Sequence, residues 1–359
     1  MKRIIALLLC VACLFTVISC GSAYPPVEST EEEQRTVMTL TLEGKSYEVK
    51  YELYRAFALM YRDEMAEGVS DPWSDDALVD ALHARVCEQI YEIYATLALC
   101  ETVGIDLYDK ETDDTVEEYI RLSIEGDDYF EGLGSYDAYL AALKEDYLNY
   151  AVADLLYRYS IGQDALYTYY MGTYDYITDT YKDSALTVTD EKVNVFYAAD
   201  DTARVMLIYL SHQVYSDAEA RLTRSTLLAE LGDGGEAAMA DWLLRHTATS
   251  EQITRGEILS PYTLDDLVYA DVTEAALALG VGEMSELIPV SGDDVYGYYL
   301  VYRMDKPASY LEDNRSDVRD TYLLHEIGKI FSSTKDALRD SRTDAPLLAT
   351  LDIATMSMD

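Results

Sequence analysis

The chain has 359 residues, of which 67 are Asp or Glu and 27 are Lys or Arg, so its formal net charge is −40 at pH 7. So acidic a surface repels phosphate, which excludes a nucleic-acid partner. Hydrophobic residues make up 49% of the chain, against 7 Pro and 18 Gly, so it can bury a sizeable core and is not a disordered acidic polymer. The length favours more than one domain.

The first residues have the pattern of an export signal. Lys2 and Arg3 precede an uncharged apolar run of fifteen residues, Ile4–Ile18, which is short for a membrane span of about 20 residues. Val-Ile-Ser-Cys-Gly at 17–21 resembles the lipobox of bacterial lipoproteins, whose cysteine becomes the lipidated N-terminus. The resemblance implies a signal peptide at 1–19, lipidation at Cys20 and a location on the extracytoplasmic face of the bacterial cell membrane. The alternative is an ordinary cleaved signal with a chance cysteine.

Loss of this signal changes the charge and the cysteine content. Without Lys2 and Arg3 the mature net charge is −40 − 2 = −42. Cys87 and Cys100 are then the cysteines besides the lipidated one, and they fall on one predicted helix. Their thirteen-residue spacing separates them by about 20 Å along a helix, whereas a disulfide needs a Cα separation of roughly 4.4–6.8 Å. We predict buried free thiols, with neither a disulfide nor a cysteine-based metal site.

The N-terminal half of the mature chain has a mainly helical pattern. Residues 20–36 are polar, Glu-rich and contain Pro25-Pro26, which predicts a flexible tether. A small hairpin is predicted next, with strands at 37–42 and 46–49. Helical patterns follow it at 51–65, 76–103, 113–125 and 136–160.

Acidic and histidine side chains were the candidates for metal binding. The acidic stretch comprises Asp106, Asp109, Glu111, Asp113 and Asp114. Asp114 and Glu117 have the spacing of a capping box at a helix start. The stretch lacks the residue order of an EF-hand, which favours a solvated loop, or weak divalent-ion binding, over a defined calcium site. The isolated histidines are predicted to be surface or half-buried residues rather than metal ligands; they are His83, His212, His246 and His325.

Strand and helix patterns alternate after about residue 190. Strands are predicted at 205–210, 287–290 and 298–302, with helices at 217–231 and 236–246. A long helix pattern then covers 310–338, with its apolar stripe at Leu324, Ile327, Phe331 and Leu338. An isolated amphipathic helix is only marginally stable in water, so this stripe needs a partner.

Five pieces of this second half carry a family likeness. They are residues 203–208, 218–231, 255–259, 276–285 and 297–301. In this order they resemble a parvulin-type (PpiC-like) peptidyl-prolyl isomerase domain over roughly 202–305, most clearly at Leu279–Ser285. With the lipoprotein signal, the helical N-terminal region and the C-terminal helix, the whole chain resembles the PrsA and SurA class of extracytoplasmic foldases.

The resemblance implies an α+β architecture and a set of partners. It divides the chain into a helical SurA-N-like domain at 37–190, a parvulin-like domain at 191–307, a C-terminal helix at 308–340 packing on the N-terminal domain, and a tail at 341–359. The implied partners are unfolded or partly folded exported proteins, and the membrane through the lipid anchor. It implies no cofactor.

The family's catalytic positions are altered in this chain. Family members place two histidines on neighbouring strands beside a Cys or Asp, and matching by motif puts these positions at Val205, Tyr299 and, approximately, Thr249. The Met and Phe positions of the proline pocket fall at Val268, Val272 and Leu277. Of the family's glycine pair, Gly256 remains, with Arg255 in place of its partner. The barrier to rotation about an X-Pro bond is about 18–20 kcal/mol, and both histidines that would help to lower it are replaced.

Three functions therefore stay open. The first is a membrane-anchored chaperone or foldase for exported proteins, with an isomerase domain that is weak or inactive. The second is an active prolyl isomerase in which Tyr299 and Thr249 supply the hydrogen bonds. The third is a surface adaptor with one fixed partner. Suppression of client aggregation separates the first from the third, and a proline-peptide assay identifies the second.

Overall fold

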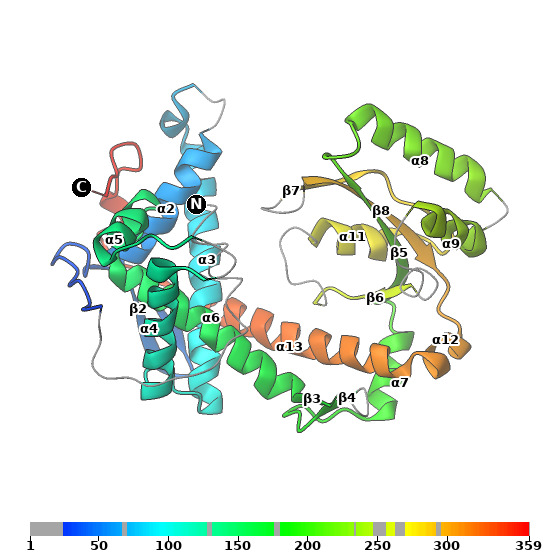
Figure 1. Cartoon of the computed structure of the whole chain (residues 1–359), viewed down its shortest axis with the longest axis horizontal. Coiled ribbons are helices and arrows are strands. Elements are labelled where there is room, and N and C mark those ends of the chain that lie inside the picture. The colour runs from blue at the N-terminus through cyan, green and yellow to red at the C-terminus, as the bar shows by residue number, and fades with distance from the viewer. Residues whose placement is uncertain are drawn as a thin grey trace. The chain divides into compact units, whose positions relative to one another are not determined.

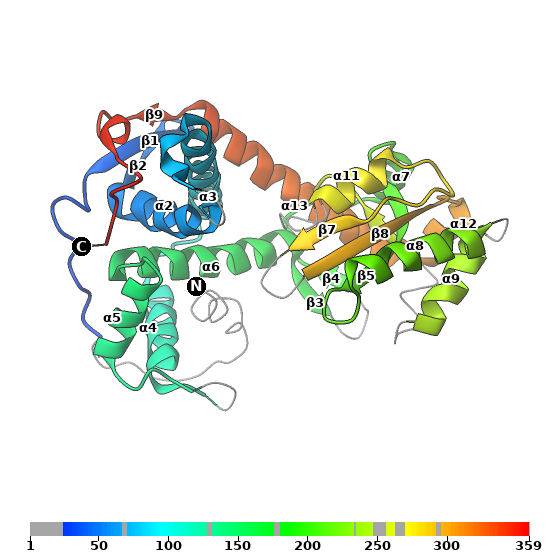
Figure 2. The same cartoon turned by 90° about the horizontal axis from the view of Figure 1, so that it is seen from above.

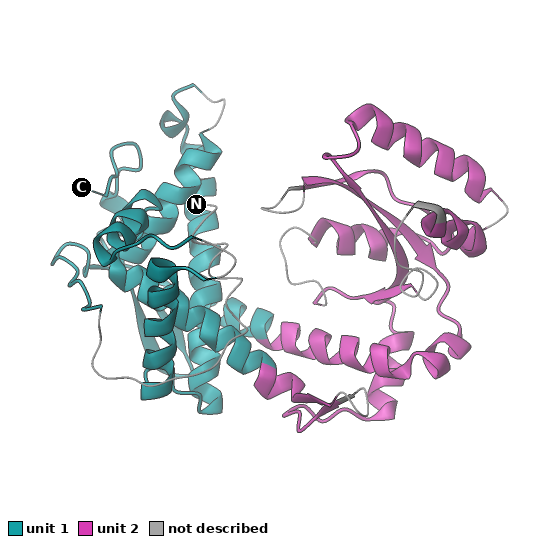
Figure 3. Cartoon of the chain, viewed as in Figure 1, with its two compact units in different colours: residues 1–167, 331–359 teal, residues 168–330 magenta. Residues whose placement is uncertain are grey.

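The computed structural model describes residues 24–66, 70–127, 131–175, 180–232, 235–246, 256–262, 270–291 and 296–358. The chain forms two compact units, shown in Figure 3: residues up to 167 together with 331–359 make unit 1, and residues 168–330 make unit 2. Helices and small antiparallel sheets occur in both, which is the α+β class predicted from the sequence. The predicted domain limits differ from these units at 168–190 and at the C-terminal helix.

Unit 1 begins with a small sheet. Strands β1 (Thr36–Leu42) and β2 (Lys45–Lys50) form a hairpin in which Leu42 lies opposite Lys45. Its turn places Glu43 and Gly44 at φ 49° and 84°, the left-handed geometry that suits the twist of a two-residue hairpin turn. On the other edge of β1, the short strand β9 (Thr343–Asp344) completes the order β2-β1-β9, visible in Figure 2.

Helices build the rest of unit 1. They are α2 (Tyr51–Met65), the short 3-10 helix η1 (Pro72–Ser74), α3 (Asp76–Val103), α4 (Lys110–Glu125), α5 (Tyr136–Glu145) and α6 (Tyr150–Met171), whose last residues belong to unit 2. The core lies between the sheet and α2–α6 and includes Tyr54, Ile90 and Tyr139. Cys87 and Cys100 both lie on α3 as buried free thiols, as predicted. None of the described helices is long and apolar enough to cross a membrane.

Two local predictions in unit 1 are corrected. Helix α4 begins at Lys110 because the Asp109 carboxylate caps it, accepting a hydrogen bond of 2.8 Å from the Thr112 amide, so Asp114 lies inside the helix and is not its cap. The single helix expected at 136–160 is two helices. The chain turns between them, with Tyr147 at φ 63°, a conformation that helical residues do not adopt.

The C-terminal segment is part of the unit 1 core. Residues 341–359, predicted to be a tail, supply β9 and the 3-10 helix η2 (Leu348–Thr350), and bury Leu348, Ile353 and Met356. The preceding helix α13 (Arg315–Asp340) contributes Leu338, which is completely buried, to the same core. The residues of α13 before Phe331 belong to unit 2, so the two units share this helix. Irregular apolar positions, rather than a periodic stripe, are why the tail's packing was missed.

Unit 2 is centred on a four-stranded antiparallel sheet. Its strands are β5 (Ala203–Ser211), β6 (Glu257–Leu259), β7 (Ile288–Ser291) and β8 (Tyr296–Met304), in the order β6-β5-β8-β7. Helices α8 (Asp217–Leu231) and α9 (Gly235–His246) cover one face, and α11 (Ala270–Ala278) covers the other (Figure 1). The Ser216 capping box starts α8, with reciprocal hydrogen bonds between Ser216 and Glu219.

The remaining elements of unit 2 form a separate cluster and a hairpin. Helices α7 (Asp190–Ala198) and α12 (Ala308–Asp313) pack with the first turns of α13 around Phe196, Tyr310 and Val318. Strands β3 (Thr173–Asp175) and β4 (Thr180–Lys182) pair as a short hairpin after α6. Neither strand was predicted, because each has only three residues.

Candidate functional site

The positions that match the family's catalytic strands lie on one face of the unit 2 sheet. Val205 on β5 and Tyr299 on β8 are on adjacent strands, where Val205 pairs with Arg303 and Tyr299 pairs with Tyr209. Val205 has no exposed surface and is packed in the cluster beneath α11. A buried aliphatic side chain neither donates nor accepts a proton, so this position supplies no acid–base group.

The predicted pocket residues join the same apolar cluster. Val272 on α11 is completely buried, and Leu277 packs at the cluster's edge together with Tyr299. The structure therefore brings Val205, Tyr299, Val272 and Leu277 together, but Val205 and Val272 are core residues and line no open cavity. Thr249, Val268 and the predicted lipidation site Cys20 lie outside the described residues.

Tyr299 contacts a second tyrosine on the neighbouring strand. Its ring lies 5.1 Å, centroid to centroid, from that of Tyr209. The Tyr209 hydroxyl is itself engaged by the Tyr296 backbone, accepting from the amide at 2.9 Å and donating to the carbonyl at 3.2 Å. This face is thus aromatic and weakly polar where the family has a paired imidazole network.

The two glycine motifs of the resemblance have clear structural roles. Gly256 adopts φ +75°, and a Cβ there would lie 2.7 Å from the Met304 sulfur, so only glycine fits where β6 begins. In the 279–285 turn, the Gly282 amide donates to the Arg303 carbonyl at 2.8 Å and the Ser285 hydroxyl accepts from the Val301 amide at 2.9 Å. Both motifs therefore support the backbone geometry of the sheet.

A buried Ser-His pair in unit 2 was not predicted. The Ser260 hydroxyl and His325 Nδ1 lie 2.7 Å apart, and the ring contacts Phe196 and Tyr262. Burial lowers the pKa of His325, which is 7% exposed and so more buried than expected. Ser260 has no exposed surface, so the pair cannot reach a substrate and is structural. Within the described residues, no group of three or more His, Cys, Asp or Glu side chains is placed to hold a metal ion.

The second candidate site is a groove in unit 1 crossed by the chain's own N-terminal segment. We call residues Tyr24–Ser29 the strap. It has no regular secondary structure, and Pro25-Pro26 restricts it to extended backbone. The predicted flexible tether at 20–36 is thus, in its described part, packed on the helices. The composition of this segment predicted a flexible tether. Composition does not reveal the contacts that hold the segment, because they come from residues distant in the sequence.

Both ends of the strap are held. At one end, the Tyr24 ring packs 5.6 Å from that of Tyr136, whose hydroxyl donates a hydrogen bond of 2.6 Å to the Pro25 carbonyl. At the other end, the Ser29 hydroxyl donates to Glu52, a buried carboxylate in the first turn of α2. Between these points Val27 is 49% exposed, so the middle of the strap is not packed into the core.

A polar network fixes the chain just after the strap. Glu52 also accepts hydrogen bonds from Gln34 at 2.8 Å and Asn149 at 2.7 Å, and Glu33 pairs with Arg55. Burial by itself would raise the pKa of Glu33, but hydrogen bonds from Thr30 and the Arg55 guanidinium outweigh it and lower that pKa. The network thus stabilises the position of residues 30–35, which join the strap to β1.

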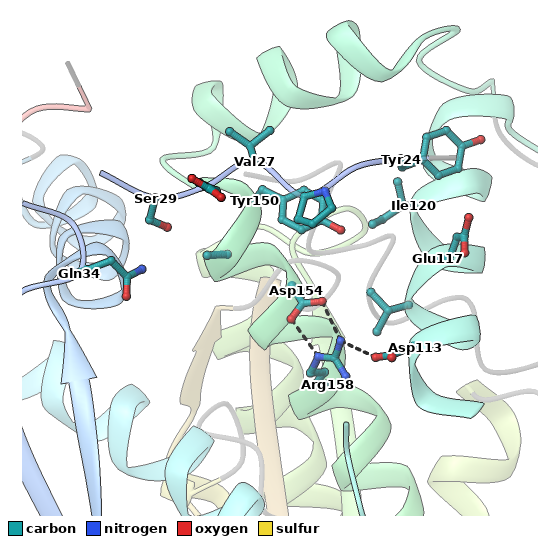
Figure 4. A pocket seen from close by; sticks show the side chains of 14 residues that line it. Tyr24, Val27, Ser29, Gln34, Asp113, Glu117, Ile120, Tyr150, Asp154 and Arg158 are labelled. Carbon is teal, nitrogen blue, oxygen red and sulfur yellow. Dashed lines mark hydrogen bonds and ion pairs between the residues drawn. The ribbon is translucent and has the colours of Figure 1, made fainter. Parts of the chain in front are cut away.

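A pocket of about 560 Å³ lies under the strap (Figure 4). Its helical wall comes from α4 and α6 and is apolar toward Val116, Ile120 and Tyr150. At its floor, Arg158 is paired with Asp113 and Asp154, each at 2.8 Å, and donates to the Leu107 carbonyl. Burial and the neighbouring Asp154 charge raise the pKa of Tyr150 to about 12, so its hydroxyl stays protonated. The lining residues are Tyr24, Pro26, Val27, Glu28, Ser29, Gln34, Asp113, Val116, Glu117, Ile120, Tyr150, Ala151, Asp154 and Arg158.

Comparison with known proteins finds a distant structural likeness. No protein-family model matches the chain, and no curated protein matches it. The chain is similar to PrsA from Bacillus subtilis, with 14% identity and a TM-score of 0.25 over 73% of this chain and 86% of that one. It is also similar to the PrsA foldase of Streptococcus pneumoniae, with 15% identity and a TM-score of 0.26 over 89% and 99%, and to that of Lactococcus lactis, with 11% identity and a TM-score of 0.25 over 90% and 100%. The PrsA-like resemblance seen in the sequence thus recurs among solved structures, at TM-scores too low to carry an argument about function.

Proposed function

We propose that the protein is a membrane-anchored extracytoplasmic chaperone of the foldase type. Its helical unit binds extended segments of exported proteins, and its parvulin-like unit has little or no isomerase activity. The observation that carries the proposal is the strap, because unit 1 already holds an extended stretch of polypeptide across a tyrosine-lined groove by side-chain contacts at its two ends. The signal and lipobox at residues 2–21 support the anchor.

The side chains on the unit 2 sheet support the proposal that isomerase activity is low. Val205 is sealed in the core, and Tyr299 presents a phenol to another phenol. With an aliphatic side chain at Val205 and the Tyr209 hydroxyl already bonded to the Tyr296 backbone, the described strand face does not reproduce the paired histidines that would hydrogen-bond near a bound X-Pro amide. Without large side chains at Val272 and Leu277, the proline ring also loses contact area, at about 0.8 kcal/mol for each CH₂ that is no longer buried.

An aggregation assay tests the chaperone function. The mature chain carrying Cys20→Ser, which keeps the protein soluble, is mixed with a chemically denatured exported protein, and light scattering is followed after dilution. We expect scattering to fall with increasing chaperone, reaching near-complete suppression at roughly equimolar amounts. An unrelated protein of similar negative charge is the control, since charge alone improves solubility. Unchanged scattering would contradict the proposal and favour an adaptor with one fixed partner.

A further inference from the structure

The strap is an extended peptide seated in a groove, and a pocket of about 560 Å³ lies beneath it. We propose that the strap occupies, in cis, a binding groove for an extended client segment that carries Lys or Arg beside apolar or proline residues, and that the pocket receives the basic side chain. This inference rests on the proposed chaperone function and names the substrate class and the internal competitor of that site.

The strap shows how the groove binds backbone. A tyrosine hydroxyl donating to the carbonyl of a residue that precedes proline, with a second aromatic ring alongside, is a way in which aromatic grooves hold extended, proline-containing peptides. Such segments lose little conformational entropy on binding because proline has already restricted their backbone. An extended client segment with an aromatic residue before proline can make the same contacts.

The pocket's charge selects the side chain that enters it. The helices contribute Asp113, Glu117 and Asp154 against the single Arg158, a formal sum of −3 + 1 = −2. The strap adds Glu28 to the same lining and so places a further negative charge over an acidic pocket. The strap is therefore a poor electrostatic match, whereas a Lys or Arg in place of Glu28 is complementary.

The pocket's shape agrees with such a side chain. Its volume of about 560 Å³ is within the roughly 300–1,000 Å³ range of ligand pockets. The apolar side chains of Val116, Ile120 and Tyr150 suit the methylene stem of a Lys or Arg, while the net negative charge of the lining attracts its charged end. This volume is free space beneath the strap, whose central residues are exposed.

Competition by the strap has a measurable consequence. A groove that is covered for part of the time binds an external peptide with an affinity reduced by the covered fraction. Ser29→Ala removes the strap's hydrogen bond to Glu52 and leaves Tyr136 and the lining residues of α4 and α6 unchanged for the client peptide. Because one hydrogen bond corresponds to a roughly 2- to 10-fold change in an equilibrium, we expect peptide affinity to rise by about that factor.

The test uses two peptides based on the strap. One has the sequence of residues 22–29, Ser-Ala-Tyr-Pro-Pro-Val-Glu-Ser, and the other has Lys in place of Glu. Binding of each fluorescent peptide to the mature Cys20→Ser chain is measured by anisotropy at low salt. We expect the Lys peptide to bind at least about 10-fold more tightly than the Glu peptide, and Ser29→Ala in the protein to strengthen its binding.

Two pairs of variants separate the groove from general effects. Glu117→Lys changes the pocket and should weaken binding of the Lys peptide about 10-fold, whereas Glu111→Lys, an exposed residue on the same helix, makes the same charge change outside the pocket and should have little effect. Ser74→Ala is the control for Ser29→Ala, because it removes a serine hydroxyl that donates to the Asp71 carbonyl elsewhere on unit 1. All four variants are checked for native circular dichroism and melting.

The outcomes distinguish this inference from the chaperone proposal. Equal binding of the two peptides, or equal effects of Glu117→Lys and Glu111→Lys, overturns the pocket assignment. Unaltered affinity in folded Ser29→Ala overturns competition by the strap. Suppression of aggregation that persists in either case leaves the chaperone function in place with a different client surface. If the mature chain without these substitutions does not suppress aggregation, the chaperone function itself is contradicted.

Discussion

Arg339, near the end of α13, donates hydrogen bonds to both carboxylate oxygens of Glu88 on α3, at 2.9 Å and 2.8 Å, across 251 residues of sequence. Each side chain keeps more than a third of its surface exposed, so the pair contributes at most about 1 kcal/mol to stability. It sets the register of α13 on α3, while the neighbouring Leu338, completely buried, supplies the larger share of the stabilisation.

Leu338→Ala should therefore destabilise unit 1 strongly. Removing a buried leucine side chain costs about 2–5 kcal/mol through lost transfer free energy and the cavity that remains. We expect the α3 region to unfold at a lower urea concentration. Hydrogen exchange of the α3 amides measures this transition. Leu222→Ala on α8, where the leucine is 66% exposed, is the matched control and should change stability by less than about 0.5 kcal/mol. Similar effects from both substitutions would show that α13 is not held in the unit 1 core.

Cys20→Ser should release the protein from the membrane. Two or more acyl chains give stable attachment where a single chain does not, so loss of the lipidated cysteine removes the anchor. Fractionation of cells should show the variant in the medium or as uncleaved precursor. Ser19→Ala, a small residue in the same box, is the control and should leave attachment intact. Normal processing and retention of Cys20→Ser in the membrane fraction would argue against lipidation at this position.

The two thiols should be unreactive until the protein unfolds. Burial raises the pKa of Cys100 to about 12, and burial also raises that of Cys87 despite the nearby Arg342 guanidinium. Thiolate is the reactive form, so an aromatic disulfide reagent at about pH 8 should react with neither cysteine in the native Cys20→Ser protein. Two equivalents should react in denaturant, and one in Cys100→Ala. Rapid reaction of native protein would mean that α3 opens locally.

Acid should weaken the junction between the strap and β1. The folded pKa of Glu33 is below its ordinary value of 4.5, so the carboxylate's stabilising contribution is complete above that value and is lost as the pH falls through the folded pKa. Glu33→Gln should therefore lower the free energy of unfolding at about pH 6 and flatten its decline toward about pH 3. Glu32→Gln, an exposed neighbour, is the control. An unchanged pH dependence in Glu33→Gln would exclude this carboxylate as a source of acid sensitivity.

Isomerase activity on proline peptides should be near background. Tyr299→Phe and Thr249→Val should leave that low rate unchanged, because the buried Val205 at the partner strand position supplies no hydrogen-bonding group to act with either hydroxyl. Robust catalysis that falls in these variants would assign the hydroxyls a working role and contradict our interpretation. Robust catalysis unaffected by both would instead place the active residues elsewhere in unit 2.

Local signals explain which elements could be predicted. Helix α3 was predicted with its observed limits, since the Asp75 side chain caps its start and Gly104, at φ 82°, ends it. The turn between α5 and α6 was missed because Tyr147, a residue with no turn preference, adopts the left-handed conformation there. The predicted strand and turn positions of unit 2 were recognisable because their apolar alternation and glycines are local.

The candidate groove could not be predicted from local patterns. Its strap is bound by Tyr136, 111 residues beyond Pro25, and its pocket combines the strap with two helices. Residues 24–29 have the composition of a linker, and their order arises from tertiary contacts. A paired proline next to tyrosine was the one available signal, and it indicates an extended segment without identifying its binding surface.

If Cys20 carries a lipid as proposed, the strap also limits how far the protein can lie from the lipid surface. Because Tyr24 is held against Tyr136, only four peptide steps separate it from Cys20, a reach of at most about 14 Å. With the lipid on Cys20, that distance is less than twice the roughly 8 Å over which physiological salt screens charge. A mature chain of net charge −42 would then be held within electrostatic range of anionic headgroups, so the strap's release would add about five residues of slack and let unit 1 move outward from the bilayer.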